Sequence, residues 1–279
     1  MFRDAGLEVR FLDPVARPER LSRLRSGEAD LALMDAASFV DSVATDSHFD
    51  AICIQVLGHR LPMAAVFVSG RHAAGAPIQE PADLVRARYG GEAGSSFVME
   101  HRALLRRLDG DDPSLHVEMP YDDLFGALAS GEIDVAPDYV GIATTYQRAL
   151  RAGETVGFLR YWDCGVRAYG TGFVAAGAAV DSGRDALVSF LDVTAESYQE
   201  MRSNPNTVIE AASALLPDID RAYAIREWQE EEEEALFGGE GYASSDPTMW
   251  AQTTAWRKEV VDFQALPPAD RLYMAIRAS

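Results

Sequence analysis

Two stretches of the sequence repeat one pattern, and they decide the fold. Residues 20–35 read RLSRLRSGEADLALMD, and residues 124–139 read LFGALASGEIDVAPDY. Each is an amphipathic helix ending in Ser-Gly, followed by Glu-x-Asp and an apolar strand with an acidic residue near its end. Glycine suits the left-handed turn that closes a helix. One copy is common in helix-to-strand loops, whereas two copies in matching order predict two lobes built on one plan.

Outside the repeat, short apolar runs alternate with amphipathic stretches, which is the pattern of an α/β protein with a largely parallel sheet. Strands are expected at residues 8–12, 29–34, 51–57, 63–68, 88–90, 116–119, 133–136, 156–160 and 172–175. Helices are expected at residues 17–26, 36–45, 81–85, 95–109, 121–130, 140–151, 184–202 and 205–216. After Asp218 two or three more helices are expected, with a helix start at Ser245-Asp246-Pro247.

The composition is that of an ordinary globular protein, with 48% hydrophobic and 25% charged residues among 279. A large core is therefore feasible, and the length fits two domains or one large one. The 44 acidic and 25 basic residues give a net charge of −19, which would repel a phosphate backbone, so nucleic acid is not an expected partner. No apolar run reaches the roughly 18 residues of a membrane span. The five glutamates at residues 230–234 are expected to form a solvated helix face.

Residues suited to catalysis or metal binding are sparse. Lys258 is the only lysine in the chain, and the five histidines are scattered without an HxxxH pair. Neither His101 nor His116 is next to an obvious nucleophile. Cys53 and Cys164 lie in apolar or aromatic surroundings and form no metal-binding motif, so both are expected to be buried free thiols. We therefore predict no catalytic residue, no metal and no cofactor. The sequence favours ligand binding over catalysis without deciding between them.

The glycine-rich segment 89–97, YGGEAGSSF, is a candidate ligand-binding loop. It leads into an expected helix, whose free N–H groups, with the hydroxyls of Ser95 and Ser96 and the open backbone at Gly94, suit a polar or anionic group of a ligand. It is neither a phosphate-binding loop ending in Gly-Lys-Ser/Thr nor a dinucleotide fingerprint. The same residues also suit a capped helix start without any ligand, and both interpretations stay open.

Three expected strand ends carry acidic and aromatic residues, namely Leu33-Met34-Asp35-Ala36, Ala136-Pro137-Asp138-Tyr139 and Tyr161-Trp162-Asp163. In open α/β sheets, ligands bind beyond the carboxyl ends of the strands. Aromatic rings stack on a flat ligand and carboxylates accept its N–H groups, so these ends favour a heteroaromatic or amine-bearing ligand. The alternative is that Tyr161 and Trp162 are core residues.

Four parts of the chain carry a family pattern in their order and spacing. They are FRDAGLEVRF with LRSGEADLALMD (2–11 and 24–35), PIQEPADLVRARYGG (77–91), SGEIDVAPDY (130–139) and WDCGVRAYGTGFVA (162–175). Together they resemble the NMT1/THI5-like (SsuA/THI5-like) family of type II periplasmic binding proteins, in its thiamine-pyrimidine and sulfonate branch. The resemblance covers about residues 2–200 and implies a Venus-flytrap fold, in which two α/β lobes are joined by two crossover hinge segments and followed by a helical C-terminal extension.

The resemblance also implies where the lobes and the ligand lie. Residues 1–67 plus 173–279 would form lobe I, and residues 68–172 would form lobe II. Crossovers near residues 65–70 and 169–174 would form the hinge, with Gly70, Gly170 and Gly172 absorbing the rotation. A ligand would be held between the lobes by Met34, Asp35, Ala36, Gly94, Ser95, Ser96, Asp138, Tyr139, Trp162 and Tyr169.

Two departures from the family pattern bear on function. Members normally begin with a strand and a helix ahead of the FRDAGLEVRF segment, so the first strand of the fold is expected to be missing here, by truncation or by loss of part of the site. A truncated start implies an extracytoplasmic protein, periplasmic or lipid-anchored, whereas an authentic start at Met1 implies a cytoplasmic one. Yeast-type pyrimidine synthases of the family need an active-site lysine for pyridoxal phosphate and a cysteine-rich motif, and the chain has neither.

The resemblance therefore implies a solute-binding protein that delivers a small ligand, such as a thiamine-related pyrimidine, to an ABC permease. Such a protein performs no chemistry and spans no membrane. The alternative is an intracellular enzyme on the same scaffold, for pyrimidine-precursor synthesis or a decarboxylase-like reaction. The ligand's identity stays open, because related members bind sulfonates, nitrate, pyrimidines and aromatic acids with one fold.

Overall fold

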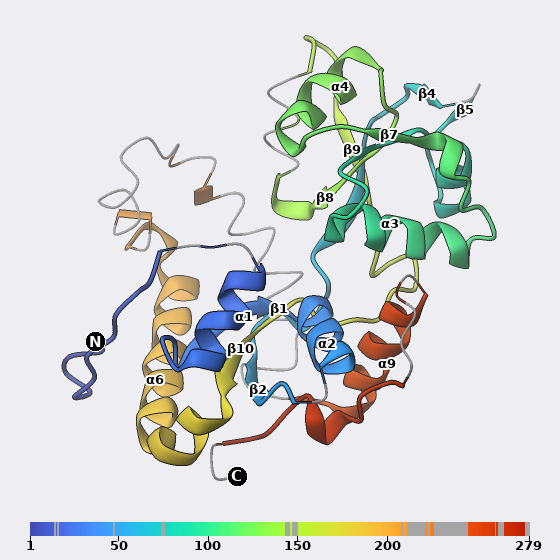
Figure 1. The fold of residues 1–279 in the computed structure, drawn as a ribbon. Coiled ribbons are helices and arrows are strands. Elements are labelled where there is room, and N and C mark those ends of the chain that lie inside the picture. Colours follow the sequence, from blue (N-terminus) through green and yellow to red (C-terminus); the bar gives the residue numbers. More distant parts are fainter. Residues whose placement is uncertain are drawn as a thin grey trace.

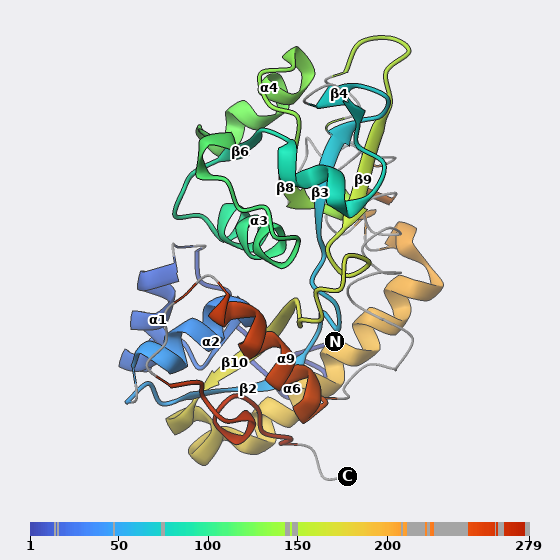
Figure 2. The ribbon, with the colours of Figure 1, turned by 90° about the vertical axis from the view of Figure 1, so that its right-hand side faces the viewer.

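A computed structural model describes residues 1–13, 15, 17–46, 48–73, 76–142, 146, 150–207, 209–210, 221, 224–225, 245–259, 261 and 265–276. The glutamate run at 230–234 lies outside the described residues, as do parts of the helices expected at 140–151, at 205–216 and after Asp218. The described chain forms two α/β lobes and passes between them twice (Figure 1 and Figure 2).

The first lobe is built on a sheet of three strands in the order β1-β10-β2. These strands are β1 (Leu31–Asp35), β2 (Ala51–Val56) and β10 (Thr171–Ala176). The helices around the sheet are α1 (Arg17–Ser26), α2 (Ala36–Thr45), α6 (Gly177–Ser203), α9 (Pro247–Lys258) and η6 (Ala269–Arg271). Apolar side chains from the strands, α2 and α9 form the core of this lobe, where Phe39, Val174 and Trp250 are at most 1% exposed.

The second lobe is built on the sheet β8-β3-β9, with a parallel pair, β6–β7, beside it. Its strands are β3 (Met63–Val68), β4 (His72–Ala73), β5 (Ala76–Pro77), β6 (Tyr89–Gly91), β7 (His116–Glu118), β8 (Ala136–Tyr139) and β9 (Val156–Arg160). Its helices are η1 (Pro81–Arg86), α3 (Ser96–Arg107), η2 (Pro113–Leu115), η3 (Tyr121–Asp123), α4 (Leu124–Ser130) and η4 (Val140–Ile142).

In each three-stranded sheet the middle strand is the one that the chain forms on entering that lobe from the other. β3 follows the first crossover, at residues 57–62, and β10 follows the second, at residues 161–170. Both middle strands run antiparallel to their two neighbours. The prediction of a largely parallel sheet was therefore wrong for these two sheets. The alternation of strands and helices along a sequence does not show which strands become neighbours. It therefore could not reveal that the strand after each crossover lies between two strands that are parallel to each other.

The internal repeat has the predicted structure in both lobes. Gly27 follows α1 with a φ of +73°, and Gly131 follows α4 with a φ of +84°, which is the left-handed conformation that glycine adopts without strain. β1 and β8 come next, and each lies beside the strand that enters from the other lobe. The two lobes are thus built on one plan, as the repeat predicts.

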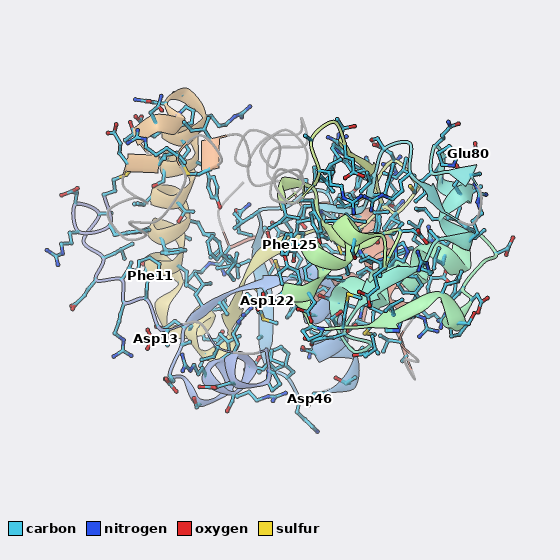
Figure 3. The ribbon with its side chains drawn as sticks, turned by 90° about the horizontal axis from the view of Figure 1, so that it is seen from above. Phe11, Asp13, Asp46, Glu80, Asp122 and Phe125 are labelled. Atoms are coloured by element: carbon cyan, nitrogen blue, oxygen red, sulfur yellow. The ribbon has the colours of Figure 1, made fainter. Side chains whose placement is uncertain are left out.

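The strand expected at residues 8–12 does not form. These residues have no strand partner, and Phe11 is 80% exposed. The N-terminal segment instead runs beside α6, where Phe2 stacks on Phe190 with ring centroids 5.2 Å apart (Figure 1 and Figure 3). Without a neighbouring strand to accept its backbone hydrogen bonds, an apolar–polar alternation is not sufficient to make a strand.

The two crossovers touch at a pair of glycines. The N–H of Gly170 donates to the carbonyl of Gly58 at 2.7 Å. A Cβ on Gly170 would lie 2.7 Å from the carbonyl oxygen of Arg60, so a larger residue would push the crossovers apart.

The position of β3 corrects the expected hinge. The first crossover lies ahead of β3, not at residues 65–70, and Gly70 comes after the strand has ended. The predicted lobe division at residues 67 and 68 cuts through the end of β3. A boundary ahead of Met63 fits the pairing of β3 with β8 and β9.

Both cysteines are free thiols, as predicted; Cys53 is buried, whereas Cys164, also expected to be buried, is half-buried. Burial raises the pKa of Cys53 to about 12 and that of Cys164 to about 11, so both stay protonated at neutral pH. In the part of the chain that the structure describes, no helix has the length and apolar character to cross a membrane.

Candidate ligand-binding site

The end of β1 presents one polar side chain. Asp35 is the N-cap of α2, and its carboxylate accepts a hydrogen bond from the Ser38 N–H at 2.7 Å. The side chains of Met34 and Ala36 are 2% and 3% exposed and belong to the first-lobe core. They also line a crevice beside Trp250 that is too tight for a water molecule. Of these three predicted site residues, only half-buried Asp35 offers a ligand a side chain.

The start of α3 is capped as one of the two interpretations requires. The hydroxyl of Ser95 accepts from the Val98 N–H at 3.3 Å, while Ser96 is exposed and no atom lies within 4 Å of a Cβ built on Gly94. The Ala93 N–H donates to the exposed carboxylate of Glu118, with 3.1 Å to Oε2. The loop thus already holds one carboxylate of its own chain, and an anionic ligand would compete with it.

Asp138 is fully buried and has partners of its own. Its carboxylate accepts from the hydroxyls of Tyr121 at 3.1 Å and Tyr146 at 2.9 Å and from the Tyr139 N–H at 2.8 Å. Burial raises the pKa of Asp138, and these hydrogen bonds oppose the rise. Three donors occupy the carboxylate, so Asp138 is placed to position tyrosines rather than to accept a ligand's amino group itself.

An aromatic patch, which we define as Phe97, Tyr121 and Tyr139, joins β8 to the start of α3. The ring of Phe97 stacks on Tyr121 with centroids 5.8 Å apart and meets Tyr139 edge-on at 5.0 Å. Tyr139 is 36% exposed. The structure therefore brings the predicted residues at the β8 end and the α3 start together, through Phe97. The Tyr121 ring also meets that of Phe125 edge-on, and Figure 3 labels Phe125 near Asp122.

Sequence reasoning missed two members of this patch. Phe97 is the last residue of the quoted glycine-rich segment, and Tyr121 opens an expected helix, yet neither was singled out. The sequence did contain a signal for them. Phe97, Tyr121 and Tyr139 all stand at or near the ends of expected helices or strands that the repeat places in one lobe.

The two predicted aromatic residues of the second crossover lie apart from the patch. Trp162 is half-buried between two guanidinium groups, those of Arg60 at 5.1 Å and Arg167 at 4.3 Å from its ring centroid. Tyr169 is 2% exposed, and its hydroxyl accepts from the Asp246 N–H at 2.7 Å. Tyr169 is thus a core residue, whereas Trp162 joins the two crossovers.

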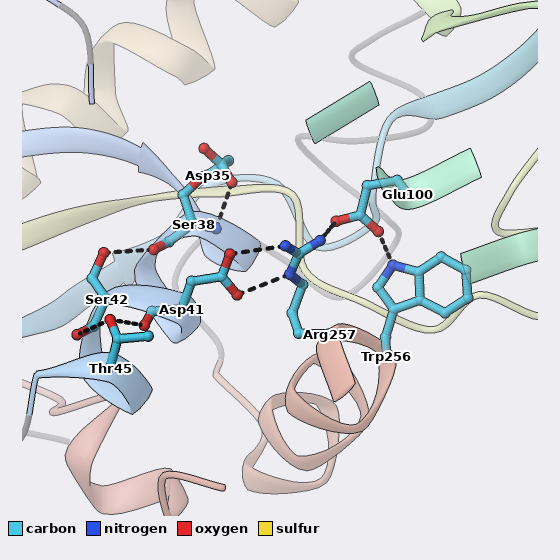
Figure 4. A network of polar contacts seen from close by, with 8 residues as sticks. All are labelled: Asp35, Ser38, Asp41, Ser42, Thr45, Glu100, Trp256 and Arg257. Atoms are coloured by element: carbon cyan, nitrogen blue, oxygen red, sulfur yellow. Dashed lines mark hydrogen bonds and ion pairs between the residues drawn. The ribbon is translucent and has the colours of Figure 1, made fainter. Parts of the chain in front are cut away.

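A buried polar network between the lobes was also missed (Figure 4). Arg257 of α9 donates from Nε and Nη2 to Asp41 of α2, at 3.0 and 2.8 Å. Its Nη1 donates to Glu100 of α3, whose carboxylate also accepts from Nε1 of Trp256. Burial raises the pKa of Glu100 to about 6, opposed by Arg257 and assisted by the charge of Asp35. Asp35 and α3 therefore lie within electrostatic range of each other across the lobes.

Among the described residues no group of three or more histidine, cysteine, aspartate or glutamate side chains is arranged to hold a metal ion.

Two lobes of one plan, joined by two crossovers, with the strand that follows each crossover in the middle of its sheet, define the periplasmic-binding-protein fold. A family described as NMT1/THI5 like matches residues 1–208, and the chain belongs to this family, as the resemblance predicts. Among curated proteins no sequence matches the chain.

Solved structures show the same fold at low identity. The periplasmic aliphatic sulphonate binding protein SsuA from Escherichia coli has a TM-score of 0.68 and 15% identity, over 86% of this chain and 73% of that one. A ligand-binding component of an ABC-type import system from Staphylococcus aureus, solved with zinc bound, has a TM-score of 0.66 and 15% identity, over 92% and 82%. The alkanesulfonate-binding protein SsuA from Xanthomonas axonopodis pv. citri, bound to MOPS, has a TM-score of 0.63 and 14% identity, over 93% and 85%.

The arrangement around Asp138 gives a first testable expectation. Asp138→Asn should lower the free energy of unfolding by about 1–3 kcal/mol, because one acceptor oxygen then faces three donors that are buried or part-buried. Urea unfolding measures this loss. Tyr146→Phe removes one of those donors, so the double variant should lose less than the sum of the single variants. An unchanged stability of Asp138→Asn, with weakened ligand binding, would instead restore Asp138 as a direct ligand contact.

Proposed function

We propose that the chain is the solute-binding component of an ABC-type importer, and that its small ligand binds between the lobes against the aromatic patch. The meeting of exposed Tyr139 with the first turn of α3, through Phe97, carries this proposal. A ring stacked on Tyr139 would lie beside Ser96 and the free N–H groups of the helix start. Family membership and the fold of the ABC-import structures support the same function. Such a component works outside the cytoplasmic membrane and delivers its ligand to a permease.

The charges around the site favour a ligand that donates hydrogen bonds. Asp35 lies on the first-lobe side, Glu118 already holds an N–H of the loop, and the net charge of the chain is −19. An alkanesulfonate would have to displace the Glu118 carboxylate, whereas an amine or a ring N–H would be accepted by Asp35. A heteroaromatic amine, such as a thiamine-related pyrimidine, is therefore the ligand class we propose.

A thermal-shift comparison tests the ligand class. An aminopyrimidine at about 100 times its dissociation constant should stabilise the protein by about 2.7 kcal/mol, which raises Tm by about 5–10 °C. Alkanesulfonates at the same concentrations should leave Tm unchanged. If only sulfonates raise Tm, the heteroaromatic proposal is wrong and the start of α3 becomes an anion site.

Tyr139→Ala tests the place of binding. Loss of the stacked ring should weaken binding of the stabilising ligand about tenfold, which corresponds to about 1.4 kcal/mol. Isothermal titration calorimetry measures the change. Phe11→Ala is the matched control, because Phe11 is also an exposed aromatic residue but lies beside α6. Equal losses in both variants, or none in Tyr139→Ala, would place the ligand elsewhere.

A further inference from the structure

Helix α9 places one tryptophan in each lobe. Trp250 belongs to the first-lobe core and meets Phe39 edge-on, with ring centroids 6.4 Å apart. Trp256 belongs to the second-lobe core, together with Leu104 of α3 and Tyr161. Both indoles are 1% exposed. They are six positions apart, a rise of about 9 Å along an α-helix, so one short helix is anchored in two separate cores.

The polar contacts of α9 span the lobes as well. Arg257 is 2% exposed, and its guanidinium joins Asp41 in the first lobe to Glu100 in the second. Glu100 is also 2% exposed, and the Trp256 indole N–H occupies its other oxygen. Each buried charge is therefore paired. Breaking such a pair by moving one partner away leaves a buried charge unsatisfied, which is strongly unfavourable.

Further contacts extend this junction along α3 and to the second crossover. Arg107 lies over the Trp256 ring at 4.9 Å, and Arg106 donates to the carbonyl of Glu259. One turn earlier on α9, Thr253 accepts from the N–H of Tyr169 at 3.0 Å. α9 thus runs beside a crossover that the chain itself uses to pass between the lobes. Figure 2 shows α9 below α3, on the side of the first lobe that faces the second.

We propose that α9 is a third hinge segment, non-covalent, which restricts the angle between the lobes in the unliganded protein. Packed cores and buried ion pairs have discrete arrangements rather than a continuous range, so a helix anchored in both lobes narrows the set of lobe angles that remain available. The two covalent crossovers touch at hydrogen-bonded glycines, and α9 adds a third connection between the lobes beside them. That rotation of the lobes serves ligand capture rests on the proposed function. That α9 restricts the angle between the lobes does not depend on it.

Distance measurement by double electron–electron resonance tests the proposal without any ligand. Spin labels at Asp185→Cys on α6 and Gln79→Cys in the second lobe, both exposed positions, report the lobe angle. Cys164→Ser removes the half-buried thiol, and buried Cys53 stays. The parent should give one narrow distance distribution. Arg257→Lys, which keeps the charge but not the bidentate pair, and Glu100→Gln, which keeps the shape, should each widen the distribution or add a second maximum.

The matched control is Glu154→Gln. It breaks the ion pair of Glu154 with Arg71, 2.8 Å long, which lies within the second lobe and away from α9. Its distance distribution should equal that of the parent. If folded Arg257→Lys and Glu100→Gln also keep the parent distribution, α9 does not restrict the lobes and the proposal is overturned. If the protein binds none of the tested solutes but the variants widen the distance distribution, the proposed function is wrong and the proposal for α9 stands.

Discussion

Replacement of Arg257 by methionine is expected to lower the free energy of unfolding by about 3–5 kcal/mol at pH 8, because it leaves a buried carboxylate without its partner. Glu100 is 2% exposed and Asp41 is 15% exposed, so neither can recover water fully when the guanidinium is gone. Urea unfolding followed by circular dichroism measures the loss. Methionine keeps much of the volume of the arginine stem, so the effect of the lost charge dominates over that of a cavity.

A matched exposed pair separates burial from ion pairing as such. Arg102→Met breaks a bidentate pair with Asp111, but Arg102 is 34% exposed, and a loss of no more than about 1 kcal/mol is expected. Adding Glu100→Gln to Arg257→Met should recover part of the stability, since it removes the unpaired charge. If Arg257→Met lowers the free energy of unfolding no more than Arg102→Met does, the network of Arg257, Asp41 and Glu100 is exposed to water, contrary to the structure.

The sequence was sufficient for features whose signals are local. The turns that end α1 and α4 require a residue that tolerates positive φ. Gly27 and Gly131 occupy these positions, and both have positive φ. Ser95 and Asp246 each precede a helix and cap it through a side-chain oxygen, as their position predicts. These interactions lie within a few residues of each other, so the pattern of residue types contains them.

The sequence was not sufficient for features made by distant residues. Arg257 lies 216 residues from Asp41 and 157 from Glu100 along the chain. The local sequence around each of the three residues therefore does not predict their network. Asp138 stood out as an acid at a strand end, but its role depends on Tyr121 and Tyr146, which reach it only once the lobe has folded. A candidate site list from sequence therefore mixes ligand-facing groups with groups that the fold has already satisfied.

The last prediction concerns the neighbours Glu100 and His101, whose burial acts on stability in opposite directions with pH. His101 is 0% exposed; its Nδ1 bonds to the Tyr161 hydroxyl at 2.7 Å, and its Nε2 has no hydrogen-bond partner in the described part of the chain. Burial lowers the pKa of His101 from 6.5 to about 3. The unfolded chain therefore binds a proton below pH 6.5 that the folded chain does not, and stability falls as pH falls. At pH 4.5 the expected cost is about 3 kcal/mol relative to pH 7.5.

Glu100 has the opposite sign. Its pKa is raised from 4.5 to about 6, so between these values the folded chain binds the proton first and stability rises by about 2 kcal/mol as pH falls. The two contributions largely cancel down to pH 4.5, below which only that of His101 still grows. Urea unfolding at pH 7.5, 6.0 and 4.5 separates them in His101→Gln and Glu100→Gln. Relative to the parent, His101→Gln should gain stability on acidification and Glu100→Gln should lose it. Parallel pH profiles for the parent and both variants would contradict the burial of these two side chains.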